Sequence, residues 1–415
     1  MCATVLDPQT EILPTTTAAG YIALEERYGA HNYHPLDVVI VRAQGCWVWD
    51  VEGRKYLDFL SAYSAVNQGH CHPRIVEALI RQAHAVTLTS RAFRNDQLGP
   101  FYQQICELTG FARFLPMNTG AEAVETAVKV ARKWGYKVKG IPDGQAEILV
   151  FANNFHGRTT TLVGFSTEAQ YKDGFGPFTP GFRVLPYGDA DAVEQAMHER
   201  VAAVLVEPIQ GEAGIIVPPA GYLARLRAIT ERHGALLVCD EIQSGLGRTG
   251  KLFAYEHEAI RPDVVIVGKA LAGGVYPVSG ILADDPVMGV LHPGDHGSTF
   301  GGNPTAAAVG RAALTALVEE RMIERSAELG PYFMARLAEI GSRHVKEIRG
   351  KGLWIGLELH PEAGGARRFC EALEREGLLC KETHESTIRI APPLIITKEE
   401  IDWAIERLAK VLTTL

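Results

Sequence analysis

The stretch LLVCDEIQSGLGRTGKLFAYEHEAIRPDVVIVGKALAGG, residues 236–274, holds two short apolar runs that each lead to an ionisable residue. The first run, 235–239, leads directly into Asp240, and the second, 264–267, reaches Lys269 after one glycine. Short apolar runs between turn signals are typical of buried strands in an α/β sheet. Because ligands of such sheets bind at the strand ends, we expect the carboxylate and the amine to face one bound molecule.

A carboxylate beside a pyridine nitrogen and a lysine at an aldehyde are the two groups that pyridoxal phosphate requires from a protein. Each residue alone also allows a simpler interpretation, with Asp240 capping a helix and Lys269 lying in a solvated turn. A short motif is only a hypothesis, so the rest of the chain must decide between these interpretations.

Size and charge narrow the class of protein. The chain has 415 residues, enough for two or three domains, with 47% hydrophobic and 22% charged residues. The net charge of −8 argues against a nucleic-acid-binding or anionic-membrane surface. No apolar run approaches the length of a membrane span.

The N-terminus and the cysteines indicate a cytoplasmic protein. The first basic residue is Arg27, and Asp7 and Glu11 precede it, so the start of the chain does not look like a targeting signal. The seven cysteines are scattered, with no CxxC motif or Cys/His cluster. This pattern predicts reduced thiols and neither a disulfide framework nor a metal site.

The order of the expected elements predicts two domains. After a loose leader at residues 1–20, strands at 38–41, 46–51 and 56–59 form an antiparallel meander, with a turn at Gly45. From about residue 70 strands alternate with helices, which is typical of a largely parallel sheet. After about residue 320 helices alternate with strands, and Thr397 with Glu400 forms a capping box for the last helix. The prediction is a large α/β domain flanked by a small domain built from both chain ends. The candidate strands of the large domain are 148–151, 201–206, 236–239 and 264–267.

Three further segments could bind an anion or a planar ring. Asn118-Thr119-Gly120-Ala121-Glu122 opens a helix with a capping box, and free N–H groups at a helix start bind phosphate well. The segment 155–158, FHGR, offers an aromatic pair for stacking and an arginine for a carboxylate. The glycine-rich segment 297–304, GSTFGGNP, suits a second phosphate contact. Each segment also has a simpler interpretation. The first could be an ordinary capped helix, the second a loop with an exposed arginine and the third a plain mobile loop.

One motif suggests a different cofactor. Residues 245–250, GLGRTG, match the dinucleotide pattern G-x-G-x-x-G. Five residues separate the preceding strand from the first glycine, and no helix start or suitably spaced acid follows. We therefore reject a nicotinamide site here. Glu212 and Arg389 are individually unremarkable ionic residues.

Taken together, these segments resemble the class III pyridoxal-phosphate aminotransferases, especially the members that act on ornithine. The similarity runs from about Tyr28 to the C-terminus in one consistent order. The matching segments are YGAHNYHPL (28–36), DVEGRKYLDFLSAYSAVNQGHCHP (50–73), LTSRAF (88–93), PMNTGAEAVETAVKVARKWGY (116–136), DGFGPFTPGF, EPIQGEAG, DEIQSGLGRTG, GKALAGGVYPVSG, HGSTFGGNP and IRIAPPL.

The resemblance implies fold type I, with a large domain built on a mostly parallel seven-stranded sheet and a small α+β domain. It places an N-terminal part of the small domain at 1–65, the large cofactor-binding domain at 66–320 and the C-terminal small domain at 321–415. It implies that Lys269 bonds to pyridoxal 5'-phosphate and that Asp240 partners the ring nitrogen. The other implied cofactor contacts are Gln243 at the ring hydroxyl, Gly120 and Ala121 at the phosphate, Phe155 and His156 at the ring face, and Ser298 and Thr299 from the neighbouring subunit of a homodimer. His156 stands where some members have tryptophan.

For the substrates, the resemblance implies transfer of the δ-amino group of ornithine to 2-oxoglutarate by ping-pong chemistry. Arg158 and Tyr33 would hold the α-carboxylate of ornithine, and Tyr63 would shape the pocket. Glu212 would pair with Arg389 until 2-oxoglutarate releases the arginine. Two alternatives stay open: a related enzyme acting on acetylornithine, 4-aminobutyrate or lysine, and a non-catalytic module that binds the same cofactor.

Overall fold

A seven-stranded sheet forms the centre of the large domain in the computed structural model, which describes residues 17–415. Strand β10 runs antiparallel to both of its neighbours, so the other six strands share one direction. This confirms the predicted, mostly parallel seven-stranded sheet. In spatial order the strands are β4 (Arg113–Met117), β10 (Ser279–Ala283), β9 (Val264–Val267), β8 (Leu236–Asp240), β7 (Val201–Val206), β5 (Glu147–Phe151) and β6 (Phe182–Leu185).

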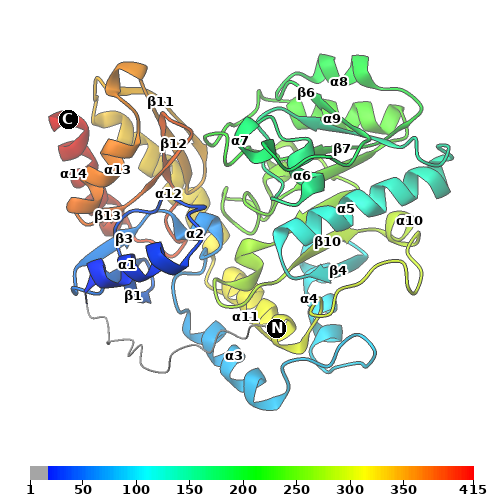
Figure 1. Cartoon of the computed structure of the whole chain (residues 1–415), viewed down its shortest axis with the longest axis horizontal. Helices are drawn as coiled ribbons and strands as arrows, with labels where there is room; N and C mark the ends of the chain where they lie inside the picture. The colour runs from blue at the N-terminus through cyan, green and yellow to red at the C-terminus, as the bar shows by residue number, and fades with distance from the viewer. Residues whose placement is uncertain (1–16) are drawn as a thin grey trace, which may run out of the picture.

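Helices cover both faces of this sheet (Figure 1). Alternate residues of one strand enter different cores: Leu236 and Val238 of β8 pack on the side of α5 (Gly120–Trp134), whereas Leu237 and Cys239 pack on the side of α9 (Tyr222–Arg232). Strands covered on both faces read as continuous apolar runs, which is why the sequence reveals them. The remaining elements of this domain are α3 (Pro73–Ala85), α4 (Leu98–Thr109), η1 (Gly135–Lys139), α6 (Thr160–Gly164), α7 (Ala169–Lys172), α8 (Ala190–Ala196), η2 (Ala254–Glu258), η3 (Lys269–Ala272), α10 (Asp285–Met288) and α11 (Pro304–Glu319).

The small domain combines both ends of the chain, as predicted. Its first sheet is the expected N-terminal meander of β1 (Ile40–Gln44), β2 (Trp47–Asp50) and β3 (Lys55–Asp58), to which C-terminal β13 (Leu378–Leu379) adds in parallel. Strand β1 starts two residues later than expected, and its pairing with β2 extends to Gln44. The other elements are α1 (Ala18–Tyr28), α2 (Ser61–Ser64), α12 (Met322–Glu339), β11 (Val345–Lys351), β12 (Trp354–Leu359), η4 (Pro361–Ala363), α13 (Arg367–Arg375), β14 (Lys381–Thr383), β15 (Thr387–Ile390) and α14 (Lys398–Thr414).

The predicted loose leader lies outside the described residues up to residue 16. Helix α1 already begins at Ala18, because the side chain of Thr17 caps it by accepting from the Gly20 N–H. The capping boxes predicted at Thr119–Glu122 and Thr397–Glu400 are both present. The domain boundaries at 65/66 and 320/321 stay a prediction.

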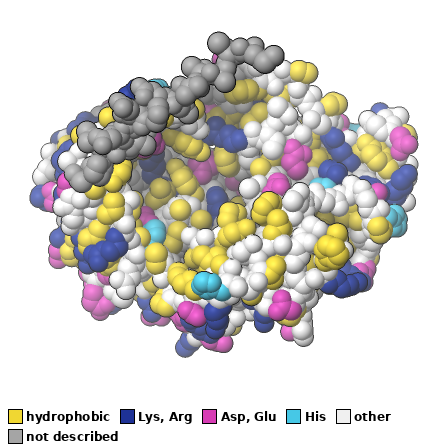
Figure 2. All heavy atoms as spheres, turned by 60° about the horizontal axis from the view of Figure 1, so that its bottom comes forward, with side chains coloured by type: hydrophobic (Ala, Val, Ile, Leu, Met, Phe, Trp, Pro, Cys, Tyr) yellow, Lys and Arg dark blue, Asp and Glu magenta, His cyan; other side chains and the backbone are white. Residues whose placement is uncertain are grey.

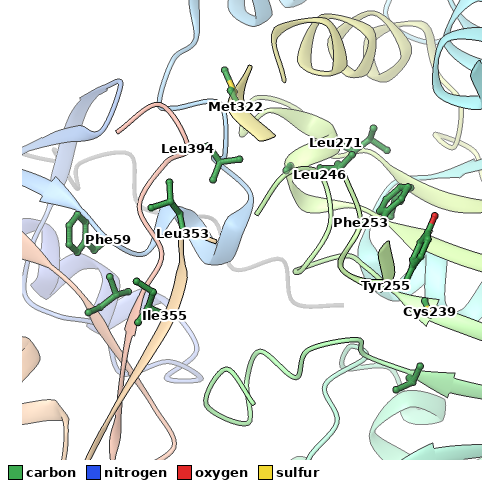
Figure 3. Packing of buried hydrophobic residues seen from close by; sticks show 14 of the residues in the cluster. Phe59, Cys239, Leu246, Phe253, Tyr255, Leu271, Met322, Leu353, Ile355 and Leu394 are labelled. Atoms are coloured by element: carbon green, nitrogen blue, oxygen red, sulfur yellow. The ribbon is translucent and has the colours of Figure 1, made fainter. Parts of the chain in front are cut away.

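One apolar core runs through both domains. Figure 3 shows it passing from Phe59 and Ile355 in the small domain, through Leu394 and Leu246, to residues such as Phe253 in the large domain. The two domains are therefore packed against each other and not merely tethered. None of the helices within residues 17–415 has the length and apolar character needed to cross a membrane.

Candidate active site

The ends of four neighbouring strands surround one cavity of about 210 Å³. Parallel strands bring their carboxyl ends to one edge of a sheet, so residues that follow β5, β7, β8 and β9 meet there. Asp240 and Lys269 both line this cavity, as the first sequence prediction requires. The lining residues in the described part of the chain are Gly120, Ala121, Phe155, His156, Gly157, Glu207, Ile209, Asp240, Ile242, Gln243 and Lys269.

Lys269 begins the 3-10 helix η3 directly after β9 and Gly268. Its φ of +44° lies in the left-handed region, which residues with a side chain seldom adopt. Burial lowers the pKa of its half-buried amine to about 8, although the nearby acids Glu212 and Asp240 act in the opposite direction. A lysine with such a pKa is partly uncharged near neutral pH, the form that acts as a nucleophile or base.

Asp240 is oriented by His156. The two side chains are buried, and His156 Nδ1 lies 2.7 Å from Asp240 Oδ2. Burial alone would lower the pKa of His156, but the hydrogen bond and charge of Asp240 outweigh it and raise that pKa. The Nδ1 nitrogen of His156 is thus engaged with the Asp240 carboxylate. The sequence suggested that His156 stacks on a planar ring, and that role does not explain its hydrogen bond to Asp240.

The start of α5 supplies an anion site on the cavity wall. Thr119 caps the helix, and Gly120 and Ala121 line the cavity with the first turn of the helix behind them. A Cβ added at Gly120 would lie 3.1 Å from Ile242 Cδ1, so glycine keeps this end of the cavity open. Together with Asp240 and Lys269, this helix start fits the phosphate, ring nitrogen and aldehyde of pyridoxal phosphate.

Ser298 and Thr299 do not line this cavity. Ser298 Oγ accepts a hydrogen bond of 2.9 Å from Asn118 Nδ2, which places its loop beside the residue that precedes the α5 cap. The expectation that these hydroxyls serve a neighbouring subunit stays a prediction.

A second ionic group adjoins Lys269. Arg389, on β15 of the small domain, is buried and places Nη2 3.0 Å from Glu212 Oε1. Its Nη1 donates to Gln243 Oε1 at 3.2 Å, and its guanidinium carbon lies 4.9 Å from the centre of the Tyr63 ring. Burial would raise the pKa of Glu212, but the charges of Arg389 and Lys269 outweigh it and lower that pKa. Glu212 is therefore ionised near neutral pH and pairs with the Arg389 guanidinium.

Arg158 lies beside the cavity on an exposed loop. Its guanidinium carbon is 3.8 Å from the centre of the Tyr171 ring and 5.6 Å from that of Phe155, which lines the cavity. Tyr33 is 78% exposed and is absent from the cavity lining. Neither side chain lines the cavity: Arg158 reaches it through its contact with the Phe155 ring, and Tyr33 lies on the surface of the single chain.

Sequence reasoning missed Glu207 as a cavity residue. It stands at the carboxyl end of the apolar strand β7, as Asp240 stands at that of β8, and this repeated pattern could have identified it. Burial raises the pKa of Glu207 to about 7, with Asp240 adding to the rise and His156 opposing it. The apolar side chains Ile209 and Ile242 were also missed, because neither carries a chemical signal.

The chain is similar over nearly its whole length to proteins of known family. The sequence profile described as Aminotransferase class-III matches residues 28–412. The chain is 61% identical over 391 residues to the ornithine aminotransferase of an Exiguobacterium species, covering 94% of this chain and 97% of that protein.

Two solved structures show the same fold. The ornithine aminotransferase of Toxoplasma gondii, described with partial occupancy of PLP at its active site, superimposes with a TM-score of 0.94 at 45% identity, covering 96% of this chain and 94% of that chain. The acetylornithine aminotransferase of Elizabethkingia anophelis superimposes with a TM-score of 0.88 at 48% identity, covering 96% of this chain and 99% of that chain. Because the sequence profile and these relatives extend over almost the whole chain, the protein belongs to the class III aminotransferase family.

Proposed function

We propose that this aminotransferase moves the δ-amino group of ornithine to 2-oxoglutarate, using pyridoxal 5'-phosphate. The observation that carries the proposal is the Glu212–Arg389 ion pair, which stands beside Lys269. Such a pair lets one cavity accept two substrates with different charges. The ornithine aminotransferase of the Exiguobacterium species, with its high identity, supports the choice of amino donor.

When bound, the cofactor would withdraw electrons through its ring and acidify the substrate C–H bond. Asp240, oriented by His156, would hold a proton on the ring nitrogen. The Lys269 amine, with its lowered pKa, would take the proton from the substrate carbon and return it as the general acid. Phe155 would lie against the ring, Gln243 would contact the ring hydroxyl, and the start of α5 would hold the phosphate.

The ionic groups divide substrate recognition between them. Arg158, with Tyr33, would bind the α-carboxylate of ornithine while Glu212 neutralises Arg389. A dicarboxylate such as 2-oxoglutarate has one more carboxylate than ornithine. This second carboxylate would displace Glu212 and pair with Arg389 in bidentate fashion. Tyr63, whose ring faces the Arg389 guanidinium, would shape this part of the pocket.

We further propose a homodimer in the cytoplasm, with Ser298 and Thr299 reaching the partner's phosphate site. Large apolar side chains are exposed at Tyr33, Ile80, Phe93 and Phe300. Figure 2 shows hydrophobic side chains gathered between charged ones on one face of the molecule. Gathered exposed apolar side chains are typical of an interface between proteins. All six cysteines in the described part of the chain are free thiols, which suits a reducing compartment.

The alternative donor with specific support is N-acetylornithine, because an acetylornithine aminotransferase structure is 48% identical. Initial rates with ornithine and with N-acetylornithine as amino donor decide between them. We expect a higher kcat/KM for ornithine; a preference for the acetylated donor would overturn the proposal.

The cofactor and the lysine are tested together by absorbance spectroscopy. The purified protein should show a yellow absorbance band that ornithine removes. Lys269→Ala should lose both this response and measurable transamination, because no other lysine of residues 17–415 lines the cavity. The control is Lys137→Ala, an exposed lysine on η1, which should behave like the parent protein. Appreciable turnover by Lys269→Ala would contradict the mechanism.

A further inference from the structure

Glu207 is a buried carboxyl that the mechanism above leaves without a role. It is 6% exposed and stands at the carboxyl end of β7. Its Oε2 accepts a hydrogen bond of 3.0 Å from the Phe155 N–H, and its Oε1 lies 3.5 Å from the Gly211 nitrogen in a longer, weaker one. One carboxylate thus binds two backbone groups from separate loops.

The two loops carry different parts of the site. Phe155 belongs to the cavity wall that would face the cofactor ring. Gly211 precedes Glu212, and its carbonyl oxygen accepts from Arg389 Nη2 at 3.4 Å. A Cβ at Gly211 would come within 2.6 Å of the Gln243 side chain, so this turn packs directly on a cavity residue. Glu207 therefore links the ring-facing wall to the pair that would recognise the substrate.

We propose that Glu207 is a positioning residue whose two carboxylate oxygens fix the spacing between the Phe155 wall and the Gly211–Glu212 turn. This inference rests on the proposed function and adds a determinant of 2-oxoglutarate binding to it. The carboxylate aligns Gly211, Gly211 aligns Arg389 through its carbonyl, and Arg389 is the group that a dicarboxylate would capture.

The charge state of Glu207 makes the link sensitive to pH. The titratable groups around it are His156, Asp240, Lys269 and Tyr187, whose hydroxyl donates to the Glu207 carbonyl oxygen at 3.0 Å. The raised pKa of Glu207, about 7, means that it gains a proton as the pH falls below neutrality. A protonated carboxyl keeps one accepting oxygen, so the shorter bond to Phe155 would survive and the longer one to Gly211 would be lost.

Glu207→Gln imitates the protonated form, because its amide has one accepting oxygen and one donating nitrogen. We expect its apoenzyme to bind pyridoxal phosphate within about threefold of the parent affinity. Its KM for 2-oxoglutarate should rise about threefold to tenfold, the scale of one ordinary hydrogen bond, because the lost bond to Gly211 is a long one. The kcat should change less than KM. In the parent protein KM for 2-oxoglutarate should rise as pH falls through about 7, and in the variant this dependence should vanish.

Glu207→Ala removes both acceptors, so the apoenzyme should also bind the cofactor about tenfold more weakly. The matched control is Glu241→Gln. Glu241 is another fully buried acid with a pKa raised to about 7, but it binds Ser244 Oγ and the Tyr255 N–H and does not line the cavity. Its variant should change the melting temperature without changing either affinity.

Equilibrium dialysis of apoenzyme with pyridoxal phosphate, initial rates between pH 6 and 9, and melting temperatures form one set of measurements. The proposal is overturned if the Glu207 variants match the parent in cofactor affinity and in KM, or if Glu207→Gln cannot be distinguished from Glu241→Gln. If the parent does not use ornithine, the proposed function fails. The dialysis of Glu207→Ala against Glu241→Gln then still decides whether Glu207 positions the Phe155 wall.

Discussion

Lys269 combines three properties that its fold imposes on one amine. It follows a buried strand, it adopts a left-handed backbone conformation, and it lines the cavity as a half-buried side chain. Charging it there costs free energy, because water is partly excluded and Arg389 is also positive. The same environment that makes the amine reactive should therefore make folding depend on pH.

The first prediction concerns the apoenzyme. In the unfolded chain Lys269 titrates near 10.5, and in the folded chain near 8. Between these pH values the unfolded chain binds more protons than the folded chain, so the free energy of unfolding rises with pH. Below pH 8 the charged Lys269 amine destabilises the folded chain by the full amount. Relative to Lys269→Met, the parent should gain at most about 3 kcal/mol between pH 8 and 10.5. Urea unfolding at several pH values measures this gain, and parallel curves for the two proteins would contradict it.

At the scale of elements, α2 is the unusual feature. Its residues Ser61, Ala62, Tyr63 and Ser64 all have φ between +46° and +71°, although none is glycine. The Asp58 carboxylate holds the entry to this turn by accepting from the Leu60 and Ser61 N–H groups. A left-handed turn of this kind is strained, and it places Tyr63 under the Arg389 guanidinium.

The second prediction tests this strain with two alanines of the same segment. Ala62 is exposed with φ +46° and ψ +48°, so Ala62→Gly removes strain and little contact. It should raise the free energy of unfolding by about 0.5–1 kcal/mol. Ala65, with φ −83° and ψ −22°, is the control, since Ala65→Gly should lower stability by about 0.5–1 kcal/mol. Equal effects of the two substitutions in denaturant unfolding would rule out the strained turn.

How far the sequence predicts these elements depends on whether the signal is local. The strands and the capping boxes are local: apolar runs, Thr119 with Glu122 and Thr397 with Glu400 mark them directly. The turn at 61–64 has no such mark, because its conformation comes from Asp58 and from packing. The juxtaposition of Asp240 and Lys269 was predictable from strand ends. The bond from Glu207 to Phe155 was not, because it joins residues 52 positions apart.

At the scale of the whole molecule, the segment GLGRTG at 245–250 is a junction between domains. Its glycines allow close packing: a Cβ at Gly250 would lie 2.8 Å from the Ala327 backbone of α12, and one at Gly247 would lie 3.1 Å from Leu394. The glycines at 245–250 are therefore explained by close packing between the domains. The segment matches the pattern of a dinucleotide-binding motif for this reason and not because it binds a dinucleotide. It also brings Arg248 into the interior, close to the apolar core shared by both domains.

Arg248 is fully buried and joins three parts of the chain. Its Nη1 donates to the carbonyl oxygens of Leu353 and Pro392 at 2.9 and 2.6 Å, and its Nη2 donates to the Asn67 side chain. Removing the guanidinium would leave these acceptors buried without partners. Because hydrogen bonds to a charged group are each worth about 1.5–3 kcal/mol, Arg248→Met should lower the free energy of unfolding by about 3–5 kcal/mol.

The matched control for this third prediction is Arg325→Met. Arg325 also donates to carbonyl oxygens of the 394–396 segment, but it is only half-buried, so water can replace its contacts. Its loss should cost clearly less than that of Arg248. Urea unfolding of both variants measures the difference, and limited proteolysis shows whether the domains separate. If Arg248→Met lowers the free energy of unfolding no more than Arg325→Met does, apolar packing alone holds the domains together. Lys269 on the large domain and Arg389 on the small domain would then keep their spacing without Arg248.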